Sequence, residues 1–288
     1  MNSLLSSFQC FIGIDQTGAI SKNGINAKPL PVSLLFVNKN QKWEIIVSNE
    51  LFLDYFSPEC IKKLFQKYCN HIHLNKTFIA IDSVFGVPHR KDLKNTKSIR
   101  SYYKQAINHS HNNLFSINFG RNVAEDFFKL SKWYENSNLP KRLVESIAKA
   151  NSLFSARPYQ KNVQTGSYRT WVELGQYWKD DDYFLWPFDI ITDVDKAIIA
   201  EIYPSYFWKN YFDSSTRGKL NLSKIIDIMD ENIIYSSQID QLNEDHQDAV
   251  IASLGAYKSI DNNSYCYPYE YVEDSIRNRE GWILGVKM

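Results

Sequence analysis

The stretch Phe11-Ile12-Gly13-Ile14-Asp15 is an apolar run that ends in a carboxylate, and Phe78-Ile79-Ala80-Ile81-Asp82 repeats this pattern. Continuous apolar runs of this length predict short strands that are covered on both faces. A carboxylate at the end of such a strand stays ionised only where hydrogen bonds, a cation or a metal compensates its charge. The two runs therefore predict a buried sheet and a polar site at its edge.

The segments between these two runs predict the order of the strands. Apolar residues at 32–37 and 43–47, separated by a polar stretch, are typical of a hairpin. Ser57 followed by Pro58 is typical of a helix start, and an apolar stripe follows it. The order strand, strand, strand, helix, strand predicts a mixed sheet in which the first and fourth strands are neighbours. Asp15 and Asp82 would then lie together.

Two later segments also place acids among apolar residues. Residues 197–203 predict a short strand that contains Glu201. Residues 245–257 predict a helix in which Asp245 and Asp248 stand three positions apart and share one side near the first turn. Four acidic segments that are far apart in the sequence thus predict convergence on a divalent-metal site.

Each of these acids also has an ordinary structural explanation. Asp15 precedes a turn signal and could simply form that turn. Glu201 could pair with an arginine. The dipole of the predicted helix could stabilise Asp245 and Asp248 without any metal. The sequence leaves these alternatives open.

Residues 87–183 are expected to form a basic, mostly helical insertion within one domain that spans residues 1–288. From Val87 to Lys179 there are 16 Lys and Arg against 6 Asp and Glu, whereas from Asp180 to Asp248 there are 5 against 15. Such an asymmetry suits a site that processes a polyanion, and it equally suits two surfaces that pair with each other. The elements predicted are helices over 98–109, 121–134, 140–154 and 222–229, a strand or extended loop over 168–178, a strand over 183–191, and a terminal strand or anchoring segment over 280–286.

The composition is that of a folded protein, with 44% hydrophobic and 15% aromatic residues. The N-terminus lacks the basic region and long apolar run of a signal peptide, and no stretch approaches the roughly 20 apolar residues of a membrane helix. The four cysteines form no CxxC pair, which favours reduced thiols. We therefore expect a cytoplasmic protein with no membrane partner.

Taken together, these features resemble the RNase H-like superfamily, an α/β fold with a mixed sheet flanked by helices. Within it the chain looks most like an uncharacterised family of predicted nucleases, the domain of unknown function 429. The pattern Asp245-x-x-Asp248-Ala249 also looks like the last acidic pair of RuvC-type junction resolvases. The matching segments are residues 12–15, 80–86, 186–189, 200–204, 248–249 and 280–283.

The resemblance implies acids on the first and fourth strands, with further carboxylates from a later strand and the final helix, around two divalent metals. The expected activity is a metal-dependent nuclease with two Mg²⁺ or Mn²⁺ ions, because phosphodiester hydrolysis of this kind needs hard oxygen ligands. Asp15 would bridge the metals, with Asp82 on one and Asp248 on the other. Glu201 is the fourth catalytic candidate, and either it or Asp245 would complete a ligand shell or orient the attacking water.

Basic residues are the candidates for contact with a nucleic-acid substrate. Phosphates are commonly held by Lys and Arg, and basic groups beside aromatic side chains suit single-stranded nucleic acid. A solvated run of charge explains them equally well. The sequence does not distinguish DNA from RNA and does not give an oligomeric state. The candidates are Arg90, Lys94, Lys97, Arg100, Lys104, Arg157 and Arg169.

Two other functions are compatible with the sequence. An actin-like ATP-dependent phosphotransferase also begins with a strand that ends in an acidic phosphate loop, which Asp15-Gln16-Thr17-Gly18 partly imitates. The chain has only 11 glycines and no obvious second phosphate loop, which disfavours that function. A non-catalytic nucleic-acid-binding module on the same fold is the other alternative, and the retained acids disfavour it.

Overall fold

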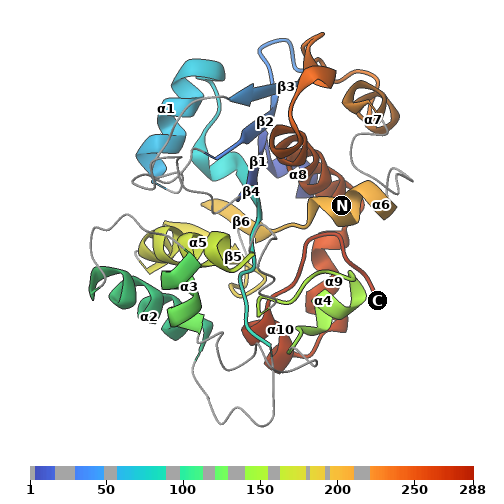
Figure 1. The fold of residues 1–288 in the computed structure, drawn as a ribbon. Coiled ribbons are helices and arrows are strands. Elements are labelled where there is room, and N and C mark those ends of the chain that lie inside the picture. Colours follow the sequence, from blue (N-terminus) through green and yellow to red (C-terminus); the bar gives the residue numbers. More distant parts are fainter. Residues whose placement is uncertain are drawn as a thin grey trace.

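The computed structural model describes residues 4–16, 30–48, 57–88, 98–112, 121–128, 140–154, 163–179, 182–191, 195–210 and 221–288. They form an α/β fold around a mixed six-stranded sheet with the order β3-β2-β1-β4-β6-β5 (Figure 1). The predicted fold class is confirmed, including the helices that follow the fourth strand.

The strands pair as the order of segments predicts. The first three form an antiparallel meander, and β4 lies parallel to β1. Helix α1 (Pro58–Tyr68) makes the crossover that a parallel neighbour requires. Beyond β4, β6 and β5 extend the sheet in parallel. The strands are β1 (Cys10–Asp15), β2 (Val32–Val37), β3 (Trp43–Ser48), β4 (Thr77–Asp82), β5 (Tyr183–Trp186) and β6 (Ala197–Glu201).

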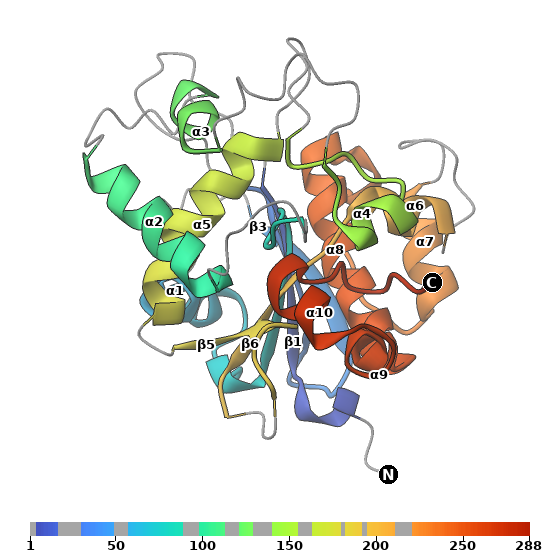
Figure 2. The same cartoon turned by 90° about the horizontal axis from the view of Figure 1, so that it is seen from below.

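Helices cover both faces of the sheet, which explains why its central strands are apolar throughout (Figure 2). On one face, Ile79 and Ile81 of β4 join a core with Tyr103 and Trp171. This face carries α1, α2 (Ile99–Asn112), α3 (Arg121–Phe128) and α5 (Val163–Lys179). The opposite side carries α4 (Leu143–Ile147), α6 (Pro204–Asn210), α7 (Leu222–Met229), α8 (Glu244–Asp261), α9 (Tyr267–Tyr271) and α10 (Asp274–Glu280). Short 3₁₀ helices are η1 (Leu4–Ser7), η2 (Leu74–Lys76), η4 (Ile239–Gln241) and η5 (Ser264–Cys266).

Several segments differ from the sequence prediction. The helix predicted over 140–154 is shortened to α4, and the strand predicted over 183–191 is shortened to β5. Of the two alternatives given for the last predicted segment, the structure has the anchoring one. Residues 168–178 belong to helix α5, so the predicted strand or extended loop there is wrong. The buried residues Tyr168, Trp171 and Trp178 recur at helical spacing, and their packing outweighs their preference for strands. Residues 281–288 form no strand but anchor the chain end, because Trp282 and Leu284 are buried and the Leu284 N–H donates to the Glu201 carbonyl at 2.9 Å.

Glycine at position 13 allows helix α8 to approach strand β1 closely. A Cβ atom at Gly13 would lie 2.0 Å from the Ala249 carbonyl oxygen and 2.4 Å from the Ser253 nitrogen, both in α8. The helix is buried over most of its length and has small residues such as Ala252 on its sheet side. This close packing fixes the distance between the N-terminal half of α8 and the end of β1. Among the helices within the described ranges, none is long and apolar enough to cross a membrane.

Candidate metal centre

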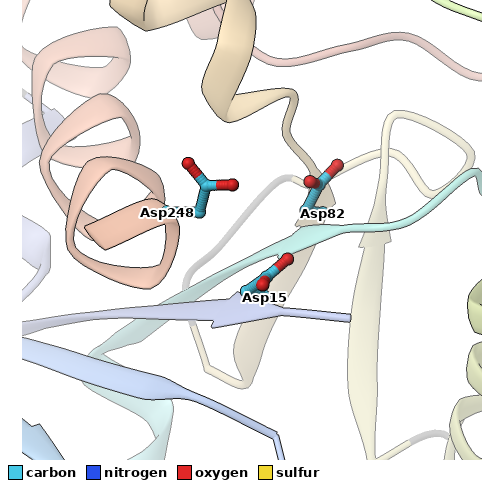
Figure 3. A group of neighbouring side chains, drawn as sticks. All are labelled: Asp15, Asp82 and Asp248. Atoms are coloured by element: carbon cyan, nitrogen blue, oxygen red, sulfur yellow. The ribbon is translucent and has the colours of Figure 1, made fainter. Parts of the chain in front are cut away.

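Three aspartates converge where strands β1 and β4 end (Figure 3). One carboxylate oxygen from each of Asp15, Asp82 and Asp248 lies within 4.8 Å of the others. Asp15 is 7% exposed and Asp248 2% exposed, while Asp82 is partly exposed. The cluster is therefore largely withdrawn from solvent but accessible at Asp82.

The register of the sheet places the first two carboxylates side by side. Asp15 and Asp82 are direct partners in the parallel pairing of β1 with β4. Side chains alternate between the faces of a strand, so Asp15 points to the same face as Gly13, where α8 packs. Asp82 shares this face because it is the register partner of Asp15. The sequence prediction that these two acids lie together is confirmed.

Helix α8 brings the third carboxylate. Asp248 directly precedes Ala249, the residue whose carbonyl faces Gly13, so the close approach at Gly13 also brings Asp248 to Asp15. The buried Trp208 of α6 donates its indole N–H to Asp248 Oδ1 at 3.2 Å. This bond orients the carboxylate, in the way that outer hydrogen bonds orient metal ligands. The sequence analysis did not anticipate Trp208.

The electrostatics of the cluster favour a bound cation. Three carboxylates whose oxygens lie within 4.8 Å of one another repel each other when ionised, and the burial of Asp15 and Asp248 reduces the screening by water. Carboxylate oxygens are the ligands that Mg²⁺, Mn²⁺ and Ca²⁺ prefer. The three aspartates therefore form a group that could hold a metal ion.

Glu201 lies at the same edge of the sheet but on the opposite face. It pairs with Ile81 in the register of β4 with β6, one residue out of step with Asp82. Its Oε2 accepts from Arg142 Nη1 at 2.8 Å and from the Phe85 N–H at 2.9 Å, and Arg142 Nη2 donates to Oε1. The sequence left open whether Glu201 is a metal ligand or pairs with an arginine. In the structure it pairs with Arg142 and lies outside the aspartate cluster.

Arg142 is the centre of a second group of buried charges. Its side chain is fully buried and also donates to Glu145 Oε1 at 2.9 Å and to the Glu280 carbonyl at 2.8 Å. Burial lowers the pKa of Arg142, but Glu201 and Glu145 raise it by more, so the guanidinium stays charged. Burial raises the pKa of Glu201, and Arg142 and the Phe85 N–H counteract this rise. The sequence analysis counted Arg142 only as part of the basic segment.

The fifth predicted acid, Asp245, is partly exposed in the first turn of α8 and does not belong to the cluster of three. The helix begins after Asn243, whose side chain accepts from the His246 N–H at 3.0 Å. Asp245 therefore lies where a helix dipole stabilises an acid.

The basic candidates are only partly described. Arg100 is half-exposed, bonds Asp189 at 2.8 Å and lies 4.3 Å from the Trp178 ring, while Lys104 is exposed on the same helix. Arg169 is buried and bonds Glu173 at 2.8 Å, so it does not face solvent. Four candidates lie outside the described residues: Arg90, Lys94, Lys97 and Arg157.

Comparisons with known proteins give no identification. No family model, no curated protein and no solved structure matches this chain. The sheet, with its antiparallel β1-β2-β3 and its parallel β1-β4 pair, is consistent with an RNase H-like fold. The likeness therefore rests on strand order and on the position of the acids.

Proposed function

We propose that this chain is a metal-dependent nuclease that hydrolyses phosphodiester bonds of nucleic acid. The observation that carries the proposal is the convergence of Asp15, Asp82 and Asp248 from two neighbouring strands and a helix. We also place the chain with the uncharacterised family of predicted nucleases, on the segments quoted above.

The three aspartates would hold two Mg²⁺ or Mn²⁺ ions, with Asp15 shared between them. Bound divalent ions supply an activated water at neutral pH and stabilise the charge that develops on the phosphate. The protein's part is positioning. Trp208 orients Asp248, and the pairing of β1 with β4 fixes Asp15 beside Asp82. Glu201 is left out of the proposed ligand set because Arg142 and Phe85 already bond both of its oxygens.

The segment after Asp82 supports this positioning because four separate side chains hold it. Val84 N–H donates to Ser167 Oγ at 3.1 Å, and the Trp171 indole N–H donates to the Val84 carbonyl at 2.7 Å. Phe85 is bonded by Glu201 at its N–H and by the Tyr103 hydroxyl at its carbonyl. A loop fixed from α2, α5 and β6 leaves the Asp82 backbone little freedom.

The experiment is a pair of measurements on wild type and on Asp15→Asn. Calorimetry should show Mn²⁺ binding that Asp15→Asn loses. Cleavage of labelled DNA, RNA and hybrid oligonucleotides in Mn²⁺ should fall by at least a hundredfold in the same variant, as expected for loss of a ligand to a catalytic metal. Asp261→Asn is the control, because Asp261 is an exposed acid at the other end of α8.

Three results would contradict the proposal. One is a wild-type protein that binds no Mn²⁺ and cleaves none of these substrates. Another is ATP hydrolysis without nucleic-acid cleavage, which would favour a phosphotransferase-like function. Nucleic-acid binding that survives both Asp15→Asn and Asp248→Asn, without cleavage by wild type, would indicate a non-catalytic module.

A further inference from the structure

A pocket lies between helices α2 and α5, which are neighbours on one face of the sheet (Figure 1 and Figure 2). Its volume is about 200 Å³. An apolar cavity of about 150 Å³ can hold a benzene molecule, so a ligand of one or two rings fits here. The residues that line this α2–α5 pocket are Arg100, Tyr103, Lys104, Ile107, Gly175 and Trp178.

The pocket has an apolar floor where the two helices meet. A Cβ atom at Gly175 would lie 3.2 Å from side-chain atoms of Ile107 and Tyr103, so α5 has no side chain to fill this place. Tyr103 is 1% exposed and Trp178 is 2% exposed, and both close the pocket from below. The partly exposed Ile107 and the aliphatic stems of the two cations supply most of the surface that a ligand would touch.

The polar groups of the floor already have partners. The Tyr103 hydroxyl donates to the Phe85 carbonyl at 3.2 Å, and the Trp178 indole N–H donates to Asp189 Oδ2 at 2.7 Å. The described lining contains no carboxylate and no carboxamide. A nucleobase would therefore lose the hydrogen bonds that its edge makes with water, whereas an apolar ring has none to lose.

Arg100 offers a planar cation at the mouth of the pocket. Its guanidinium carbon lies 4.3 Å from the centre of the Trp178 ring, and its Nη2 bonds Asp189 at 2.8 Å. These two contacts hold the guanidinium in place, while half of the side chain remains exposed. Because arginine stacks on aromatic faces, a ring in the pocket can pack against the exposed part of this group.

Lys104 adds a positive charge that no acid compensates. It lies one helical turn after Arg100 and is exposed on the same side of α2. It makes no ion pair with any acid in the part of the chain that the structure describes. A carboxylate at the mouth of the pocket would therefore meet an ammonium group that is free to pair with it.

We propose that the α2–α5 pocket binds a small aromatic carboxylate, with its ring against Ile107 and Arg100 and its carboxylate at Lys104. Charge complementarity favours an anion, because the described lining has two cations and no acid. The apolar floor favours a ring without polar edges. The site shares no residue with the aspartate cluster, so this inference does not depend on the proposed nuclease function.

The test is calorimetry of wild type with indole-3-acetate and with indole-3-acetamide, which has the same ring but no charge. Wild type should bind indole-3-acetate with a Kd below about 1 mM, which a ligand of this size can reach. It should bind indole-3-acetamide about fivefold more weakly, the factor that corresponds to about 1 kcal/mol for one exposed ion pair.

Two variants assign the contacts. Lys104→Gln should bind both compounds with the wild-type affinity for indole-3-acetamide, because only the charge pair is lost. Lys63→Gln is the matched control, since Lys63 is an exposed lysine on α1 and should not affect either Kd. Arg100→Lys keeps the charge but removes the planar group, so both compounds should bind about threefold more weakly with the fivefold preference retained.

Any of three outcomes would overturn the site. Wild type could fail to bind either compound at millimolar concentration, or it could bind the two equally. In the third outcome, a single-stranded oligonucleotide binds, Lys104→Gln weakens that binding, and neither compound competes with it. The pocket would then belong to a nucleic-acid substrate. Loss of metal binding in Asp15→Asn is measured separately, so failure of this inference and failure of the proposed function can be told apart.

Discussion

Two groups of largely buried carboxylates lie at the same edge of the sheet, and they differ in what separates the acids. In one, Arg142 lies between Glu145 and Glu201 and bonds both. In the other, Asp15, Asp82 and Asp248 approach one another within 4.8 Å. The first group is neutralised from within the protein and joins distant segments. The second has the form of a ligand set.

The comparison teaches that burial of an acid does not by itself indicate function. Glu201 of the first group and the three aspartates of the second are all embedded in apolar sequence, and these four acids were predicted to belong to one site. What distinguishes them is that Arg142 bonds the glutamates of the first group, whereas the aspartates of the second lie close to one another. The following predictions test whether the first group acts in stability and the second in metal binding.

The largest effect is expected for Arg142→Met. Removing the guanidinium leaves Glu201 and Glu145 buried without their shared cation, which typically costs about 3–5 kcal/mol of the free energy of unfolding. Urea unfolding followed by circular dichroism measures this loss. Arg100→Met is the control, because the half-exposed Arg100–Asp189 pair should contribute no more than about 1 kcal/mol. Similar losses of unfolding free energy in the two variants would show that the buried group stabilises the fold no more than the half-exposed pair does.

The next effect concerns how much bound Mn²⁺ raises the stability of the fold. At Mn²⁺ concentrations of about one hundred times Kd, binding should stabilise wild type by about 2.7 kcal/mol, because the ion binds only the folded state. Thermal melts with and without Mn²⁺ measure it. Glu201→Gln should keep the full increase in Tm, whereas Asp82→Asn should lose it. The reverse pattern would move the metal site to the Arg142 group.

A smaller effect is expected for Trp208→Phe. The variant keeps the buried ring but removes the N–H that orients Asp248, and loss of such an outer hydrogen bond typically lowers metal affinity about tenfold. Calorimetry with Mn²⁺ measures the change. Trp282→Phe is the matched control, since it removes an indole bond to the Val286 carbonyl of 2.9 Å that is unrelated to the cluster. Equal Mn²⁺ affinities in the two variants would show that the Trp208 hydrogen bond has no role in metal binding.

The smallest effect is expected for Asp245→Asn. Asp245 is partly exposed and outside the cluster, so Mn²⁺ affinity should stay within about twofold of wild type, as for an ordinary surface substitution. A tenfold loss in the same calorimetric titration would bring Asp245 into the ligand set.

The sequence was sufficient to predict the pairing of Asp15 with Asp82. Two apolar runs of equal length, with a hairpin and a helix between them, leave few ways to arrange the strands. The position of Asp248 could be predicted for a similar reason, because its helix is rich in small apolar residues and must pack on the sheet. In each case the information lies in local pattern and in the rules of chain connection.

Glu201 shows what local pattern does not contain. Its face depends on the register between β4 and β6, and a shift of one residue would turn its side chain to the aspartates. Its arginine partner lies 59 positions away in a segment that sequence described only as basic.

The convergence of β1, β4 and α8 has a consequence for synthesis of the protein. Asp15 and Asp82 are synthesised before Asp248, so the three carboxylates can come together only once α8 has emerged from the ribosome. Until then the nascent protein holds only two of the three aspartates. A chain that stops before α8 would contain strands β1 and β4 but could not form the group of three aspartates.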